Sequence, residues 1–137
     1  MKEWTAEELA TIGGAEELRV AGRRDDSGLR EPVTVWSVRL GDHLYVRSVN
    51  GRGAAWFRGI QARHEGRVWA GGVEKEVRFV ETDDANDAVD DAYKAKYARY
   101  PSIVPHILAS AARAATLELV PLGEDDAIGT NTRRREQ

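Results

Sequence analysis

Apolar and polar residues alternate along several short stretches of the chain, with the two-residue period of a half-buried strand. Residues 33–40 alternate in this way about Val35 and Trp36, and residues 43–49 repeat the pattern. Gly41-Asp42 separates the two stretches, with glycine at the first position of the turn, as a type II′ hairpin requires. The strands predicted from the pattern cover residues 17–22, 33–40, 43–49, 67–70, 73–80 and 115–120.

Other stretches have the 3.6-residue period and the end signals of helices. Thr5 and Glu8 form a capping box at the start of the first helix, and Gly13-Gly14 ends it. Asp83 or Asp84 is placed to cap a later helix, which Pro101 stops. Further helices are predicted from about residue 54, from about 86 to 100, and over 104–112.

Antiparallel hairpins interrupted by helices indicate an α+β barrel rather than a parallel sheet. The strands are enough to close a small barrel, which removes most exposed edges. We expect one domain over residues 1–122, followed by a polar, disordered tail over residues 123–137.

Composition narrows the possible chemistry. The chain has no cysteine, which excludes disulfides, thiolate catalysis and thiolate-bound metals. No apolar run is long enough to span a membrane and the N-terminus has no apolar signal segment, so we expect a cytoplasmic protein with no membrane partner. The net charge of -3 gives no sign of nucleic-acid binding over the whole chain.

Charge is unevenly distributed. Residues 39–67 hold six arginines and two acids, whereas residues 81–91 hold six acids and no base. Arginine presents a planar fork of donors that suits phosphate and carboxylate, although a codon bias toward arginine explains its abundance equally well.

The junction over residues 45–59 is the most informative stretch. A strand runs into a glycine-containing loop, and a helix then begins, which places free N–H groups and the positive end of a helix dipole together. Around this anion site the sequence gathers Arg47, Ser48, Asn50, Gly51, Arg52, Trp56 and Arg58. The alternative is a well-capped helix with solvated arginines and a tryptophan in the core.

Two further stretches are candidates. The polar loop before Trp36 carries Arg30, and its alternative is an ordinary surface loop. Tyr93, Tyr97 and Tyr100 form one helical stripe that borders a pocket or, alternatively, belongs to the core with hydroxyls at its rim. The three histidines lack metal-ligand spacing, and no serine–histidine pair or G-x-S-x-G motif is present.

The run from YVRSVNG through AAWFRGIQARHEGRVWAGGVEKEVRFV resembles an uncharacterised bacterial family of domains of unknown function, grouped with the FMN-binding split barrels. More distantly, Ser48, Gly51 and Trp56 are similar to the strand-ending serine, glycine loop and tryptophan of deazaflavin-dependent nitroreductases. Gly22-Arg23 through Arg30 is similar to their G-R-x-x-G-x-x-R loop, here longer by two aspartates.

The resemblance implies a split β-barrel that binds FMN or a deazaflavin and transfers hydride to a small organic substrate, with no side chain acting as a catalytic acid or base. It also implies a homodimer. On this hypothesis Arg47, Ser48, Asn50 and Arg52 hold phosphate, and Arg30 and Arg58 support it. Gly51 belongs to the same cofactor-binding loop. Trp36 and Trp56 flank the ring, and Tyr97 and Tyr100 border the substrate. The competing hypotheses are a binding module that has lost the cofactor, and a nucleic-acid binder, which the acidic net charge disfavours.

Overall fold

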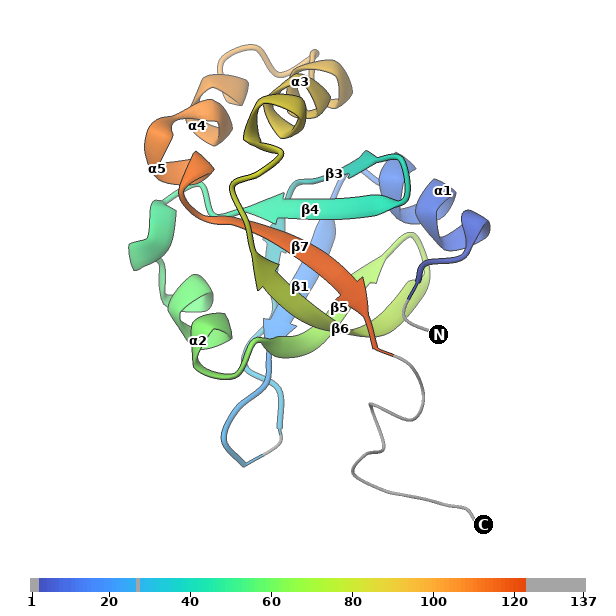
Figure 1. Ribbon diagram of the computed structural model, residues 1–137, viewed down its shortest axis with the longest axis vertical. Coiled ribbons are helices and arrows are strands. Elements are labelled where there is room, and N and C mark those ends of the chain that lie inside the picture. The colour runs from blue at the N-terminus through green and yellow to red at the C-terminus, as the bar shows by residue number, and fades with distance from the viewer. Residues whose placement is uncertain (1–2, 27, 123–137) are drawn as a thin grey trace.

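The computed structural model describes residues 3–26 and 28–122, which form one seven-stranded antiparallel sheet and its covering helices (Figure 1). The predicted tail, residues 123–137, lies outside the described residues. The strands are β1 (Leu18–Gly22), β2 (Val33–Val35), β3 (Ser37–Leu40), β4 (His43–Arg47), β5 (Glu65–Ala70), β6 (Val73–Glu81) and β7 (Thr116–Pro121). The helices are α1 (Ala6–Gly14), α2 (Ala55–Arg63), α3 (Asn86–Lys96), α4 (Val104–Leu108) and α5 (Ser110–Arg113), with a single 3-10 turn at Gly51–Gly53.

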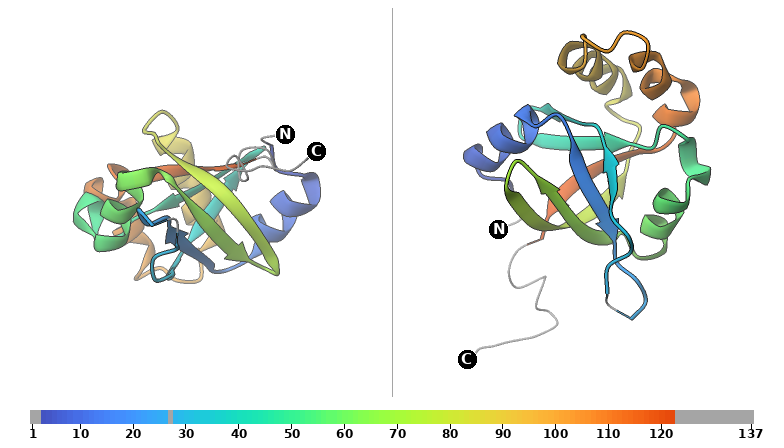
Figure 2. Two further views of the ribbon diagram at one scale, coloured as in Figure 1. Left: turned by 90° about the horizontal axis from the view of Figure 1, so that it is seen from below. Right: turned by 180° about the vertical axis from the view of Figure 1, so that it is seen from behind.

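The strand order makes the sheet a split barrel. The order is β2-β1-β5-β6-β7-β4-β3, so the two edge strands, β2 and β3, are consecutive in the chain. Trp36 alone separates them, and the curled sheet therefore brings its two edges together at this residue (Figure 2). The α+β split barrel expected from the sequence is confirmed. The single strand predicted over residues 33–40 is wrong, because the chain passes from one edge of the sheet to the other at Trp36.

Two apolar cores lie on opposite faces of β4. Leu44 and Val46 point into the barrel, whereas Tyr45 points outward into a second cluster that also contains Val38 and Val89. Helices α3 and α4 cover this outer face (Figure 1). The alternation predicted for residues 43–49 is confirmed over residues 43–47, where the strand ends, and the second core explains why both of its faces are buried.

The predicted start of the first helix, α1, is confirmed, and its capping side chains come from residues close to one another in the chain. The hydroxyl of Thr5 accepts from the N–H of Glu8, whose carboxylate accepts from the N–H of Thr5, which completes the predicted capping box. The side-chain cap that Asp83 or Asp84 was predicted to give α3 is wrong, because Ala85 occupies the N-cap position.

The later helices are shorter than predicted. The stretch 86–100 is helical only to Lys96, and turns connect it to α4. Ala109 adopts an extended conformation (φ -66°, ψ 156°), which divides the predicted helix 104–112 into α4 and α5. None of the helices in the described residues is long and apolar enough to cross a membrane.

Candidate functional site

A groove of about 500 Å³ opens where the barrel is split. Strand β2 forms one wall, and the end of β4, helix α2 and helix α4 form the other. Helices α2 and α4 lie on the side of the barrel away from α1 (Figure 1). The lining residues are Glu17, Val33, Thr34, Val35, Trp36, Arg47, Val49, Asn50, Trp56, Ile103 and Ile107. The groove therefore brings together four of the residues predicted for the cofactor site, Trp36, Arg47, Asn50 and Trp56.

Two half-buried indoles face this groove. Trp36 stacks on Tyr97 with ring centroids 3.8 Å apart and ring planes 5° from parallel. The Tyr100 ring also lies 5.5 Å from this indole, and the part that the two tyrosines leave uncovered lines the groove. Trp56 stands edge-on to Phe57 and packs against the barrel core. Each indole is thus held by a buried aromatic neighbour, which suits a wall for a planar ligand.

The guanidinium of Arg47 is buried and hydrogen-bonded to acceptors within the protein. Its side chain is fully buried, and its Nη1 donates to Asp90 Oδ1 at 2.6 Å and to the carbonyl of Ile107 at 3.1 Å. Its Nη2 donates to the carbonyl and side-chain oxygens of Asn86, and its Nε donates to Thr116 Oγ1 at 2.9 Å. A phosphate would have to compete with all of these acceptors, so the proposed function below does not use Arg47 as a phosphate ligand.

Arg30 is not one of the lining residues, but it is exposed close to the groove and is free to bind an anion. A Cβ added to Gly59 would come within 2.7 Å of Arg30 Cδ and 2.8 Å of its Nε, so the arginine lies directly on helix α2. Gly59 is one turn from Trp56, which places Arg30 next to the groove. Within residues 3–26 and 28–122 no acid forms an ion pair with Arg30.

The other predicted phosphate ligands do not line the groove. Ser48 is buried, and its hydroxyl has no hydrogen-bond partner among the described residues. Gly51 packs against Ala111, and Arg52 donates to the carbonyl of Ala114 and pairs with Glu81 at 3.0 Å. Arg58 is exposed two residues after Trp56, a spacing that places the two on different faces of the helix.

The two tyrosines predicted to border the substrate lie behind Trp36. The hydroxyl of Tyr97 donates to the carbonyl of Glu16 at 2.7 Å and accepts from the buried N–H of Ser37 at 3.2 Å. The hydroxyl of Tyr100 bonds to the Glu16 carboxylate. Neither side chain lines the groove, and both border a separate, smaller hollow. Their observed contacts are those of residues that hold the junction between β2 and β3.

Lys96 adds a titratable group to the same junction. Its Nζ donates to the carbonyl of Ser37 at 2.7 Å, and burial lowers its pKa from 10.5 to about 8. Between these two values the unfolded chain binds more protons than the folded chain, so this group makes stability rise with pH from about 8 to 10.5. Below pH 8 the full penalty of the buried charge is present.

We therefore expect the stability difference between the wild type and Lys96→Met to shift in favour of the wild type as the pH is raised from 7 to 10.5. Urea unfolding at several pH values measures this difference. Lys94→Met is the control, because Lys94 is exposed on the same helix. A difference that stays constant with pH for Lys96→Met would contradict the expectation.

Several groove residues were not anticipated from the sequence. Val49 and Ile103 are apolar yet 47% and 46% exposed, and both stand at the rim. Glu17 reaches the groove because Leu18 pairs with Val35, which places Glu17 across from Trp36. For Val49 the sequence offered one signal, an apolar residue next to the predicted anion loop. The place of Glu17 in the groove follows only from the pairing register of β1 with β2.

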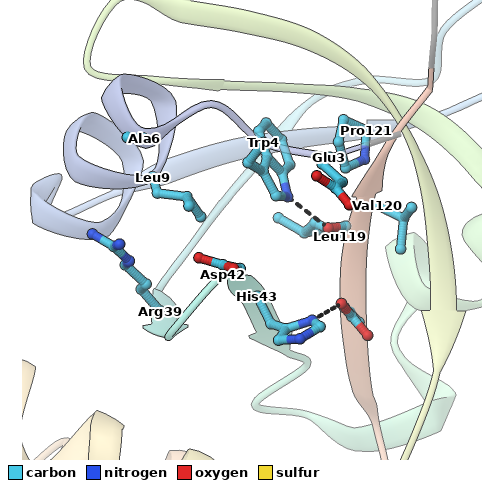
Figure 3. Close-up of a pocket in the computed structure, with 11 residues that line it drawn as sticks. Glu3, Trp4, Ala6, Leu9, Arg39, Asp42, His43, Leu119, Val120 and Pro121 are labelled. Atoms are coloured by element: carbon cyan, nitrogen blue, oxygen red, sulfur yellow. Dashed lines mark hydrogen bonds and ion pairs between the residues drawn. The ribbon is translucent and has the colours of Figure 1, made fainter. Parts of the chain in front are cut away.

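A second hollow, of about 460 Å³, lies on the α1 side of the barrel (Figure 3). Its walls include Trp4, whose indole N–H donates to the carbonyl of Leu119, and a pair formed by His43 and Glu118 at 2.6 Å. None of the predicted site residues lines it. Over the described residues, no group of three or more potential ligands is placed to hold a metal ion.

Comparison with solved structures supports the fold. The conserved hypothetical protein Rv2991 from Mycobacterium tuberculosis superposes with a TM-score of 0.61 at 10% identity, covering 88% of this chain and 81% of that one. A NimC/NimA family protein from Clostridium acetobutylicum gives 0.54 at 12% identity, covering 84% and 79%. An FAD-binding protein from Mesorhizobium loti gives 0.52 at 19% identity, covering 90% and 92%. At these identities the likeness shows a common fold.

Sequence comparison places the chain in a family. No curated protein matches it. One family model matches residues 8–119, which include the whole of the sheet except the last two residues of β7. The chain belongs to DUF2255, a family of uncharacterised proteins conserved in bacteria.

Proposed function

We propose that this protein binds a flavin-type cofactor, FMN or a deazaflavin, in the split groove and uses it to reduce a small organic substrate. The observation that carries the proposal is the groove itself, which Trp36 and Trp56 both line, with the free guanidinium of Arg30 outside the lining residues, against Gly59 of helix α2. Its volume lies in the range of small-molecule sites. The fold shared with an FAD-binding protein supports the same conclusion.

The residues present fit such a group. Two indoles, with Val33, Val35 and Ile103, offer apolar surface for a planar ring. Arg30 offers a planar fork of donors for a phosphate, and the missing side chain at Gly59 gives it room. When bound, a flavin or deazaflavin supplies hydride transfer. The protein's part is to orient the ring between the indoles, to neutralise phosphate through Arg30, and to exclude water with the apolar walls.

Removal of Arg30 tests the proposal. We expect Arg30→Ala to weaken binding of the cofactor about 10-fold or more, because hydrogen bonds to charged groups contribute about 1.5–3 kcal/mol. Purified protein is titrated with FMN and, separately, with a deazaflavin, and quenching of tryptophan fluorescence is followed. Arg58→Ala is the matched control, since Arg58 is an exposed arginine on another face of the same helix, and its affinity is expected to stay within about 2-fold of the wild type.

Two results would overturn this proposal. One is the absence of saturable quenching by either cofactor. The other is equal affinity of the Arg30→Ala and Arg58→Ala variants. Gly59→Ala gives an independent check, because it keeps both arginines but displaces Arg30 from helix α2, and it is expected to lower affinity while preserving the fold.

The second candidate is a binding module without turnover. The contacts of Arg47 and Arg52 favour this candidate. Both arginines were predicted to bind phosphate, but both donate hydrogen bonds to acceptors within the chain. It predicts saturable binding of a small molecule and no consumption of reduced cofactor with any acceptor. Turnover of reduced cofactor separates the two candidates.

We also propose that the protein is a homodimer that uses the rim of the groove. The exposed apolar side chains of Val49 and Ile103 stand at this rim and would be covered by a second copy. The mass in solution, compared with 15.2 kDa for one chain, checks this proposal. A monomer at all concentrations would contradict it.

A further inference from the structure

The groove has chemically different ends. Strand β1 runs beside β2, with Leu18 opposite Val35 and Val20 opposite Val33. Beyond one end of the groove Gly22 accepts a backbone hydrogen bond from Arg30, and at the other end Glu17 lies across from Trp36. Five residues of strand separate Glu17 from Gly22, a span of about 17 Å. The groove therefore has an acidic end at Glu17, and Arg30 lies beyond its opposite end.

The acidic end is not neutralised by the protein. No cation of residues 3–26 or 28–122 forms an ion pair with Glu17, whereas the neighbouring Glu16 is engaged by Arg99 and Tyr100. The other charged lining residue, Arg47, is paired with Asp90. Among the residues that line the groove, Glu17 is therefore the charged side chain without an ion-pair partner.

Trp36 stands beside this carboxylate. Tyr97 stacks on its indole and the Tyr100 ring lies 5.5 Å away, and the part of the indole that these rings leave uncovered turns to the groove, where Ile103 and Val49 provide apolar surface. An indole face next to a carboxylate is the combination that binds organic cations, through cation–π attraction and charge pairing together.

We propose that the Glu17–Trp36 end of the groove binds an organic cation, so that the substrate class of this protein is a small apolar molecule carrying a protonated or quaternary amine. This inference rests on the proposed function for its redox meaning. The cofactor's phosphate would occupy the Arg30 end, and the cationic substrate would enter from the opposite end.

The test uses two probes of similar size and opposite charge, benzyltrimethylammonium and phenylmethanesulfonate. Each is titrated into the full chain without cofactor, and tryptophan fluorescence is followed. The cation is expected to bind about 10-fold more tightly than the anion, a ratio in keeping with a partly desolvated cation–π site. Glu17→Gln is expected to reduce this ratio at least about 3-fold and Glu17→Lys to reverse it, because these changes remove and invert the local charge.

Glu7→Gln is the control, because Glu7 is an exposed acid on α1, outside the groove. Its ratio is expected to equal that of the wild type. A ratio that Glu17→Gln leaves unchanged, or no preference for the cation in the wild type, would overturn the inference.

Failure of this inference can be told from failure of the proposed function. Cation preference without binding of FMN or a deazaflavin would support the Glu17–Trp36 site and reject the redox role. Cofactor binding without a preference for the cation would support the proposed function and reject the Glu17–Trp36 site.

Discussion

Replacing Arg47 with methionine is expected to lower the free energy of unfolding by about 3–5 kcal/mol, the range observed when one partner of a buried ion pair is removed. The side chain is fully buried and joins β4 to α3, to β7 and to the carbonyl at Ile107. The substitution removes the arginine donor from all of these acceptors. Asp90 keeps its pair with Arg113 and the Asn86 side chain keeps the Thr116 hydroxyl, but each buried group that is left unsatisfied costs about 1–3 kcal/mol. Urea unfolding followed by circular dichroism measures the change.

Arg78→Met is the control for this experiment. Arg78 pairs with Glu65 across the β5–β6 surface, and both side chains are about half exposed. Exposed pairs of this kind contribute about 0–1 kcal/mol, so a small change is expected. If Arg47 bound phosphate rather than holding the fold, Arg47→Met would unfold like the wild type and lose cofactor affinity alone, and that result would reject the structural role.

Replacing Tyr97 with phenylalanine is expected to lower the free energy of unfolding by about 1–3 kcal/mol. The stack on Trp36 survives in this variant, but the buried N–H of Ser37 and the carbonyl of Glu16 lose the hydroxyl that joins them. Burial also raises the pKa of Tyr97, so the hydroxyl remains a donor in mildly alkaline solution. Thermal or urea unfolding gives the size of the loss.

Tyr100→Phe is its matched control. The same atom is removed from a neighbouring tyrosine, but this hydroxyl lies at the surface beside the Glu16 carboxylate. A loss below about 1 kcal/mol is expected there. Equal losses in the two variants would mean that the junction at Ser37 does not depend on Tyr97.

The parts of the fold that were predictable are those set by neighbouring residues. The Thr5–Glu8 capping box and the alternation of Leu44 and Tyr45 depend on spacings of a few residues, and both are confirmed. The break at Trp36 was missed because the apolar alternation continues through it. Only the pairing of β2 with β1 and of β3 with β4 shows that the chain changes edges there.

The candidate site was harder to predict for a related reason. A sequence does not distinguish an arginine that binds a ligand from one that pairs with a buried acid. The partner of Arg47 is Asp90, which lies 43 residues further along the chain. The same limit applies to Tyr97, whose partner Ser37 is 60 residues away. Trp36, Asn50 and Trp56 were found because aromatic and small polar residues next to a glycine loop are uncommon in combination, and these residues do line the groove.

The position of β7 has a consequence for how the chain folds. This last strand lies between β6 and β4, and without it the sheet would consist of two separate pieces, β2-β1-β5-β6 and β4-β3. During synthesis the strands of both pieces emerge from the ribosome before β7, the strand that connects them. The two walls of the groove therefore cannot be fixed relative to each other until residues 116–121 have emerged, and we expect slow folding dominated by contacts between distant parts of the chain.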